Sequence, residues 1–493
     1  MLKLNSEPSS TAVNLLRCAK QLGADFVFTN LGSDHPAFIQ AFSQWDDTRE
    51  IPEIVRQYMK WTYELRVPES VRHVMVRGHQ MACAEPQGPV YITGARELWE
   101  ESVEPTEHAP MPPARLGGLT QEEAAKIWNM LAKAERPMLI TSYLGRNPEA
   151  VARLLALSDE FGIAVQEVAP QYMNFPGTHP NHIGHQRDRF VDEADLILMV
   201  DTDVPWLPQV VEPQPDATVI GIDCDPQKDG IGLWCYPLAE SYRADSCEAL
   251  GQLLALGREA GRADPALLKR RRQWLAQAKA AIGERAARKR TSQGVTPEAL
   301  TQAVKALVDD DTIVLVESPS ATVLIPSILQ MEKPGSYFTS GASGLGWAIN
   351  AAIGAKLACP EKTVIALVGD GCYLFGVPSS AYWVAGQYQT PMLTIIYNNG
   401  GWHSPKVSND LVHDQGGLAG QRDAYWITIG QGAKLAHVAE MAGGAAAFDV
   451  EEPSQLKKAL KQALATVRKG RSAVVNVRLQ PISLQTLQRR GAE

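Results

Sequence analysis

Residues 365–375, IALVGDGCYLF, place a single carboxylate, Asp370, between two glycines directly after an apolar run. The run Val364–Val368 is short, uninterrupted and rich in β-branched and aliphatic residues, which is typical of a buried parallel strand. A charge at the end of such a strand is costly unless it has a partner. Glycines on either side remove side-chain bulk and allow a close approach of the backbone. The stretch therefore predicts a ligand at the end of this strand.

The next apolar run ends in polar residues of a matching kind. Residues 392–397, MLTIIY, are followed by Asn398, Asn399, Gly400 and Gly401. Ligands of open α/β sheets bind at the carboxyl ends of the strands, so both groups of side chains are expected at one edge. A carboxylate, an amide oxygen and a backbone carbonyl suit Mg²⁺ or Ca²⁺ completed by phosphate oxygens. We interpret the pair as a metal–diphosphate site; two unrelated turns are the alternative.

Bulk composition sets the class of protein. The chain has 493 residues, 45% hydrophobic and 21% charged, with a net charge of −8. These values predict a globular protein of two to four domains without a nucleic-acid partner. The basic run Lys269–Arg272 is expected to form the solvated face of a connecting helix. Seven cysteines without a CxxC pair, and no apolar segment of membrane-spanning length, predict a cytoplasmic protein.

Alternating strand-like and helical segments predict an α/β fold with parallel sheets. We place a first domain at residues 1–107, ended by a proline-rich loop, and a central Rossmann-like domain at 118–260. Thr120 is the expected N-cap of the first helix of the central domain. A charged helical linker is expected at 261–294, and a C-terminal domain at 295–480.

Residues 312–402 resemble the C-terminal domain of thiamine diphosphate-dependent enzymes of the acetolactate synthase and benzoylformate decarboxylase type. The similar segments are VLVESPSATVLIPS, TSGASGLGWAIN, IALVGDG and YNNGGW. Residues 118–260 resemble the central domain of that superfamily, and the loop TNLGSDHPAF at 29–38 resembles part of its pyrimidine-binding domain. The resemblance implies three doubly wound parallel-sheet domains, the last of which binds thiamine diphosphate and Mg²⁺.

The same resemblance implies the metal ligands. By position they are the side chains of Asp370 and Asn399 and the backbone carbonyl of Gly401. The amides of Gly371 and Cys372 would contact the diphosphate. The family often has serine where Cys372 stands.

Two further positions follow from the resemblance at residues 341–346, GASGLG. Leu345 occupies the bulky apolar position that supports the bent cofactor. The carbonyl of Ser343 would accept a hydrogen bond from the 4′-amino group, at a site where many members have glycine.

The first domain departs from the family. Members carry a glutamate there that activates the cofactor through its aminopyrimidine. We find no equivalent between residues 41 and 90, where several strands and helices of the domain are missing from the sequence. Glu50 and Glu53 lie near this gap but in a different sequence context. We therefore predict a truncated pyrimidine-binding domain.

Other polar residues are secondary candidates. Ser33, Asp34 and His35 lie in the loop that faces the thiazolium in the family, and helix capping is the alternative for them. His403 is a candidate for contact with the substrate, with a solvated loop as the alternative.

Two binding motifs are not expected to be functional. The histidines of 179–185, HPNHIGH, are expected in a surface or active-site-facing loop rather than in a zinc site, since they cannot share a helix face. The glycines of GASGLG do not match a dinucleotide fingerprint, which weighs against an NAD-dependent dehydrogenase. No flavin pattern is found.

These observations predict a thiamine diphosphate- and Mg²⁺-dependent enzyme that decarboxylates a 2-oxo acid, joins it to a second carbonyl compound, or does both. The alternative is a non-catalytic or defective form that binds the cofactor but lacks the activating glutamate. The resemblance also implies a homodimer or homotetramer.

Overall fold

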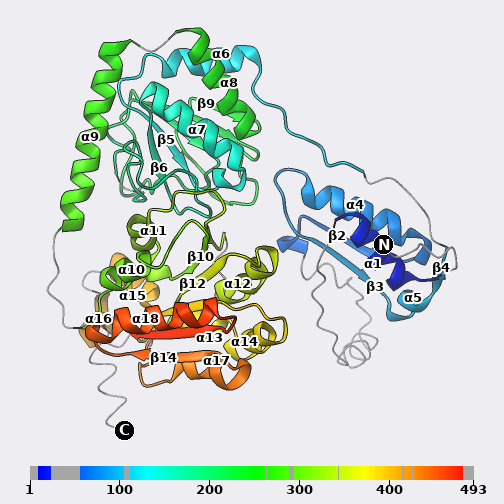
Figure 1. Cartoon of the computed structure of the whole chain (residues 1–493). Coiled ribbons are helices and arrows are strands. Elements are labelled where there is room, and N and C mark those ends of the chain that lie inside the picture. Colours follow the sequence, from blue (N-terminus) through cyan, green and yellow to red (C-terminus); the bar gives the residue numbers. More distant parts are fainter. Residues whose placement is uncertain are drawn as a thin grey trace. The chain divides into compact units, whose positions relative to one another are not determined.

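The structure is a computed structural model. It describes residues 9–23, 56–104, 111–187, 189–261, 264–287, 294–341, 344–413, 416–422 and 427–480. The chain divides into two compact units, Met1–Gly117 and Gly118–Glu493 (Figure 1). None of the described helices is long and apolar enough to cross a membrane.

The first unit has a small apolar core around one parallel strand pair. Strands β2 and β3 run parallel, and the short strands β1 and β4 pair antiparallel. Leu65, Val71, Val74 and Leu98 form the buried core. The elements are β1 (Ser9–Ser10), α1 (Thr11–Gln21), η1 (Arg56–Tyr58), β2 (Trp61–Leu65), η2 (Pro68–Ser70), α4 (Val71–Cys83), β3 (Val90–Gly94), α5 (Arg96–Glu100) and β4 (Ser102–Val103).

Several residues singled out in the sequence lie outside the described part of this unit. They are Ser33, Asp34 and His35 of the candidate loop, and Glu50 and Glu53 near the predicted gap. The truncation of this domain and the role of its loop stay predictions.

The central part of the chain forms a five-stranded parallel sheet in the order β6-β5-β7-β8-β9. Thr120 begins its first helix as predicted, since its hydroxyl accepts from the amide of Glu123, whose carboxylate accepts from the amide of Thr120. The elements are α6 (Gln121–Leu131), β5 (Pro137–Thr141), η3 (Leu144–Arg146), α7 (Pro148–Phe161), β6 (Ala164–Glu167), β7 (Leu196–Val200), β8 (Thr218–Asp223), β9 (Glu240–Arg243) and α8 (Ser246–Glu259).

The expectation of a surface or active-site-facing loop for the three histidines is wrong for two of them. His182 and His185 are 4% and 5% exposed. The reason is that the chain around Ile183 runs alongside β6: the amide of Ile183 donates to the carbonyl of Val165, and the amides of Val165 and Glu167 donate to the carbonyls of Asn181 and Gly184. This pairing carries the two imidazoles into the interior.

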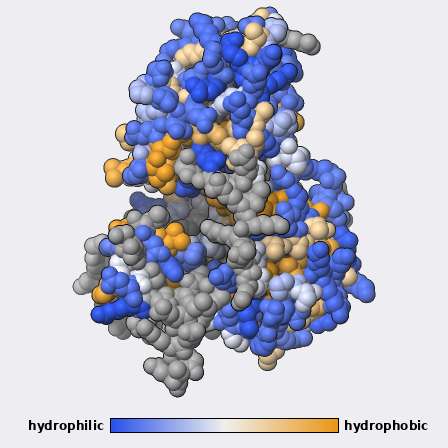
Figure 2. Space-filling view, turned by 90° about the vertical axis from the view of Figure 1, so that its left-hand side faces the viewer, coloured by the Kyte–Doolittle hydropathy of each residue, from blue (hydrophilic) through white to orange (hydrophobic). Residues whose placement is uncertain are grey.

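The predicted linker contains helix α9 (Pro265–Ala287). Lys269, Arg270 and Arg272 are exposed, as expected for a solvated face. Arg271 contradicts that expectation, because it is 1% exposed. Its guanidinium donates to the carbonyls of Leu131, Ala134 and Phe161, near the ends of α6 and α7. In Figure 2, mainly hydrophilic side chains cover the upper region of the face that is turned to the viewer.

The C-terminal part forms a six-stranded parallel sheet in the order β11-β10-β12-β13-β15-β14. Its strands are β10 (Thr312–Glu317), β11 (Tyr337–Thr339), β12 (Thr363–Gly369), β13 (Leu393–Asn398), β14 (Ala446–Val450) and β15 (Ala473–Arg478). Its helices are α10 (Pro297–Lys305), η4 (Pro319–Ala321), α11 (Leu324–Leu329), α12 (Trp347–Ala358), α13 (Asp370–Phe375), α14 (Pro378–Gln387), α15 (His403–Val412), α16 (Gly417–Arg422), α17 (Leu435–Gly443) and α18 (Pro453–Arg468).

Alternate residues of the buried strands face opposite sides of this sheet. Ile365 and Leu367 of β12 pack into the apolar cluster that includes residues of α10, α11 and α18. Val364, Ala366 and Val368 pack into a second cluster with α12, α14 and α17. Helices therefore cover both faces, which explains why the sequence shows an uninterrupted apolar run. The predicted α/β class with parallel sheets is confirmed.

The two sheets of the second unit contact each other directly. Tyr172, from the loop after β6, forms an antiparallel bridge to Phe338 of β11. The amide of Thr339 donates to the carbonyl of Gln171, and the amide of Gly177 donates to the carbonyl of Met331. Apolar residues of both sheets belong to one continuous cluster.

Candidate cofactor and metal site

Asp370 lies where β12 ends and α13 begins, and it is 2% exposed. One carboxylate oxygen accepts from the amide of Gly371 and the other from the amide of Gly400, both at 2.8 Å. Burial raises the pKa of Asp370 to about 6, while the donating amides act in the opposite direction. A cation beside this carboxylate would favour its charged form.

The paired asparagines after β13 differ in their surroundings. Asn398 is fully buried, donates to the side chain of Asn476 and accepts from the amide of Gly400. Asn399 is only half-buried, and its amide nitrogen lies 3.5 Å from the hydroxyl of Ser320. Asn398 therefore supports the turn, while the side chain of Asn399 lines the cavity described next.

A cavity of about 480 Å³ lies at the carboxyl ends of β10, β12 and β13. Residues that follow three adjacent strands of the C-terminal sheet line this cavity, because β10, β12 and β13 are neighbours in the strand order. The residues predicted from sequence that line it are Leu345, Asp370, Gly371, Cys372, Asn399, Gly401 and His403. Ser343 lies outside the described residues.

Two glycines keep the backbone close around this cavity. A Cβ on Gly371 would lie 2.5 Å from the indole nitrogen of Trp402. A Cβ on Gly401 would lie 2.2 Å from the backbone oxygen of Ile427. Real Cβ atoms do not approach other heavy atoms so closely, so both positions require glycine.

Glu317, at the end of β10, fixes the loop that carries Leu345. One of its carboxylate oxygens accepts from the amide of Gly346 at 2.6 Å, and the other accepts from the amide of Ala348 at 2.8 Å. A carboxylate at the N-terminal end of a helix is also favoured by the helix dipole. Glu317 is not among the residues predicted from the sequence, although its position at the end of an apolar strand resembles that of Asp370.

Three other groups define the chemistry of the cavity wall. Burial, together with the charge of Glu317, raises the pKa of Cys372 to about 12, so its thiol stays neutral at pH 7. Burial lowers the pKa of His403, the first residue of α15. Within the described residues, the hydroxyl of Ser318 and the Nδ1 atom of His403 have no hydrogen-bond partner. Both residues line the cavity and can serve a bound ligand.

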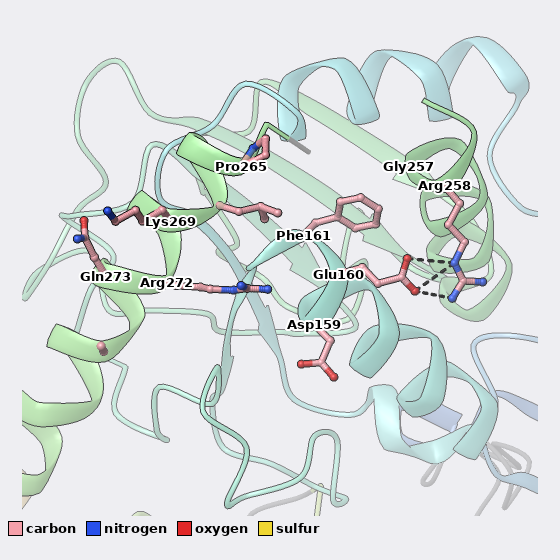
Figure 3. A pocket seen from close by; sticks show the side chains of 11 residues that line it. Asp159, Glu160, Phe161, Gly257, Arg258, Pro265, Lys269, Arg272 and Gln273 are labelled. Carbon is pink, nitrogen blue, oxygen red and sulfur yellow. Dashed lines mark hydrogen bonds and ion pairs between the residues drawn. The ribbon is translucent and has the colours of Figure 1, made fainter. Parts of the chain in front are cut away.

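A second cavity lies on the central part of the chain, between α7, α8 and α9 (Figure 3). Lys269 and Gln273 of α9 line one side. On the other side Glu160 pairs with Arg258, with oxygen–nitrogen distances of 2.5–3.1 Å. Asp159 is likewise paired, with His179. Both acidic side chains of this cavity thus have a side-chain partner, whereas Asp370 accepts hydrogen bonds from backbone amides.

Comparison with protein families gives two matches. The family model described as the C-terminal TPP-binding domain of thiamine pyrophosphate enzymes matches residues 320–477. The model described as the central domain of thiamine pyrophosphate enzymes matches residues 124–231. Thiamine pyrophosphate is another name for thiamine diphosphate. Together the two matches cover more than half of the chain.

Curated relatives agree with these matches. The chain is 28% identical over 336 residues to a benzoylformate decarboxylase of Pseudomonas aeruginosa, covering 65% of this chain and 59% of the relative. It is 25% identical over 315 residues to the large subunit of acetolactate synthase isozyme 3 of Escherichia coli, covering 62% of this chain and 52% of the relative. The matched region therefore spans little more than half the length of these relatives.

Solved structures share the fold. A thiamine diphosphate-dependent 4-hydroxybenzoylformate decarboxylase of Rhodococcus jostii superposes with a TM-score of 0.72 at 22% identity, covering 90% of this chain and 80% of that chain. Benzoylformate decarboxylase of Polynucleobacter necessarius gives a TM-score of 0.71 at 19% identity, with the same coverage.

The fold and the cavity define an α/β protein with a cavity at the carboxyl ends of parallel strands, where ligands of open α/β sheets bind. The family matches make this assignment specific: the chain belongs to the thiamine pyrophosphate enzymes and contains their cofactor-binding domain. The resemblance inferred from the sequence is confirmed.

Proposed function

We propose that this chain is a thiamine diphosphate- and Mg²⁺-dependent enzyme that decarboxylates a 2-oxo acid, with carboligation to a second carbonyl compound as a further outcome. The observation that carries the proposal is the convergence of Asp370, Asn399 and Gly401 on one cavity at the ends of neighbouring strands. The sequence relationship to benzoylformate decarboxylase and acetolactate synthase supports this reaction class.

The donor set fits Mg²⁺. A buried carboxylate whose pKa is raised by burial is stabilised when a cation replaces the missing solvent. The side-chain oxygen of Asn399 and the carbonyl of Gly401 are further hard ligands of the kind that Mg²⁺ prefers. In this proposal Asp370, Asn399 and Gly401 hold the ion, and water and phosphate oxygens complete its shell.

The chain itself contributes binding and orientation. When bound, thiamine diphosphate supplies a thiazolium carbon that acts as nucleophile and electron sink for 2-oxo acid chemistry. The start of α13, with the amides of Gly371 and Cys372, faces the cavity and would bind the diphosphate, the amide of Gly371 exchanging its present acceptor, Asp370, for a phosphate oxygen. Leu345, held by Glu317 through the neighbouring amides, supports the apolar part of the cofactor.

We propose proton transfer for His403; Ser33, Asp34 and His35, which lie outside the described residues, stay candidates by resemblance alone. Since its pKa is lowered, the His403 ring is predominantly neutral at pH 7 and can accept a proton. The non-catalytic alternative remains a competing proposal, because the sequence between residues 41 and 90 lacks the expected activating glutamate.

The exposed apolar residues of the C-terminal domain favour a homo-oligomer. Leu374, Phe375, Val377, Trp383 and Tyr388 lie on α13, on α14 and at their ends, and are 38–65% exposed. Large exposed apolar groups of this kind mark protein interfaces. We propose that a second copy of the chain covers this surface.

Calorimetric titration of thiamine diphosphate, with and without Mg²⁺, tests the site, and CO₂ release from benzoylformate and pyruvate tests the reaction. We expect Mg²⁺-dependent binding that Asp370→Asn abolishes and Cys372→Ser, a change of similar size in the same turn, retains. Binding with CO₂ release supports the enzyme. Binding without CO₂ release from either acid supports the non-catalytic alternative, and absence of binding contradicts both.

A further inference from the structure

Three buried side chains of the central part converge where β6 ends. They are Glu167, the last residue of β6, and His182 and His185 from the segment that runs alongside this strand. All three are 3–5% exposed. One ligand atom from each lies within 4.8 Å of those of the other two. This cluster lies outside the cavity assigned to the cofactor.

The distances are close to those of a metal site. The Nε2 atom of His182 is 2.9 Å from Oε2 of Glu167, and Nδ1 of His185 is 3.8 Å from the same oxygen. Ligand atoms around tetrahedral Zn²⁺ lie about 3.3 Å apart, since the bonds are about 2.0–2.1 Å long. Both His–Glu distances are within about half an ångström of this value, whereas the two imidazole atoms, which lie within 4.8 Å of each other, would have to approach by up to about 1.5 Å to bind one ion.

The carboxylate is oriented by groups that leave one oxygen facing the histidines. Oε1 of Glu167 accepts from the backbone amide of Asn174 at 2.9 Å and from its side-chain amide at 3.0 Å. Asn174 is itself fully buried and held by Gly145 and Ser142. Hydrogen bonds of this kind orient the ligands of established metal sites.

His185 lacks a partner for the atom that faces the cluster. Among the described residues, none makes a hydrogen bond to its Nδ1 atom. A buried nitrogen without a hydrogen-bond partner costs folding free energy, and a bound ligand would remove this cost.

Room for a fourth ligand lies beside the cluster. A cavity of about 10 Å³, close to the space that one water molecule needs, is lined by Glu167, His185 and Tyr337. The hydroxyl of Tyr337, from β11 of the C-terminal sheet, also has no hydrogen-bond partner among the described residues. A water molecule there can complete the coordination and join the two sheets through Tyr337.

We propose that Glu167, His182 and His185 form a site for a divalent transition-metal ion of the Zn²⁺ type, separate from the Mg²⁺–diphosphate site. Two imidazoles and one carboxylate are a ligand set typical of Zn²⁺ and Fe²⁺. The third histidine of the segment, His179, is not part of the site, since it pairs with Asp159. The ion would stabilise the contact between the central and C-terminal sheets.

The test measures Zn²⁺ bound to the untagged, full-length protein in excess Mg²⁺, by elemental analysis after dialysis and by competition with a chromophoric chelator. We expect one Zn²⁺ per chain. His185→Gln removes a ligand and is expected to weaken binding at least 100-fold. Asn174→Ala removes the group that orients Glu167 and is expected to weaken binding 10- to 100-fold. His179→Gln, in the same segment, is the matched control and should bind Zn²⁺ as the parent protein does.

Two further measurements separate this site from other outcomes. Co²⁺ bound at two imidazoles and a carboxylate should give d–d bands without the sulfur charge-transfer band that a cysteine site such as exposed Cys235 would produce. Circular dichroism shows whether each variant folds. If a variant does not fold, Zn²⁺ binding by the parent protein still tests the proposal. Absence of Zn²⁺ binding by the parent protein, or unchanged binding by folded His185→Gln, would overturn the proposal.

Discussion

Asp201 follows β7 and is buried at the carboxyl end of the central sheet. Ser246 donates to it at 2.6 Å, and Arg146 lies 3.5 Å away. Burial nevertheless raises the pKa of Asp201 to about 6 from the ordinary value of 3.8. These contacts thus compensate only part of the cost of removing this carboxylate from water.

This raised pKa predicts how the stability of the protein varies with pH. A carboxyl whose pKa is raised on folding stabilises the folded state below about pH 4, and this contribution is lost as pH rises through 6. The two pKa units correspond to about 3 kcal/mol of unfolding free energy. Asp201→Asn lacks the titrating carboxyl and should not show this loss of unfolding free energy. The unfolding free energy of the variant minus that of the wild type should therefore increase between pH 4.5 and 7.5.

Urea unfolding at several pH values measures that difference. Asp216→Asn, which alters an exposed carboxylate in the turn before β8, is the control and should follow the wild type across the range. A pH-independent difference between Asp201→Asn and wild type would show that Asp201 does not titrate as its burial requires.

Arg271 gives a second prediction at the scale of the residue. Its guanidinium satisfies three carbonyls near the ends of α6 and α7. Arg271→Ala leaves these carbonyls buried without a donor, so we expect a loss of about 3 kcal/mol or more in unfolding free energy. Arg272→Ala, the adjacent exposed position, should change it by less than about 0.5 kcal/mol. Equal effects of the two substitutions in denaturant unfolding would refute this role.

At the scale of the element, the start of α12 depends on a side chain from another element. Glu317 of β10 holds the amides of Gly346 and Ala348 at once. The glycine at 346 is needed because φ is +95° there and a Cβ would lie 2.6 Å from backbone atoms of Phe375 and Gly376. The loop that carries Leu345 is therefore fixed by β10 on one side and by the end of α13 on the other.

Glu317→Gln tests this arrangement. Glutamine can accept only one of the two hydrogen bonds, and its amide nitrogen would face the other backbone N–H. We expect the affinity for thiamine diphosphate with Mg²⁺ to fall 10- to 100-fold, as for other groups that orient ligands. Glu361→Gln, an exposed change in the same domain, should leave the affinity unchanged in calorimetry. Unaltered affinity of Glu317→Gln would rule out a positioning role.

At the scale of the whole molecule, the proposed oligomer depends on the exposed apolar surface of α13 and α14. Trp383 is 60% exposed there. Trp383→Glu places a charge in the proposed interface, where desolvation is costly, so we expect a smaller species in analytical ultracentrifugation. Leu233, 98% exposed on the central domain, provides the control, and Leu233→Glu should not alter the oligomeric state. A wild-type monomer would contradict the proposal directly.

Much of the fold and of the cofactor site follows from local sequence. The apolar runs before Asp370 and Asn398 predict buried parallel strands, and parallel strands bring their carboxyl ends to one edge. Thr120 begins a helix through a hydrogen bond to a residue three positions away. Such features depend on neighbours in sequence and on the geometry of strands, so they can be inferred without the tertiary structure.

Other features depend on which distant segments meet, and the sequence pattern does not contain that information. Arg271 belongs to a charged run, yet it is buried because α6 and α7 end beside it. His182 and His185 lie in a segment rich in proline and glycine, and only its pairing with β6 brings them to Glu167. The sequence alone thus determined the class of fold and the cofactor motif. The tertiary structure decided the surroundings of these polar side chains, because burial and charge compensation depend on contacts between residues far apart in the chain.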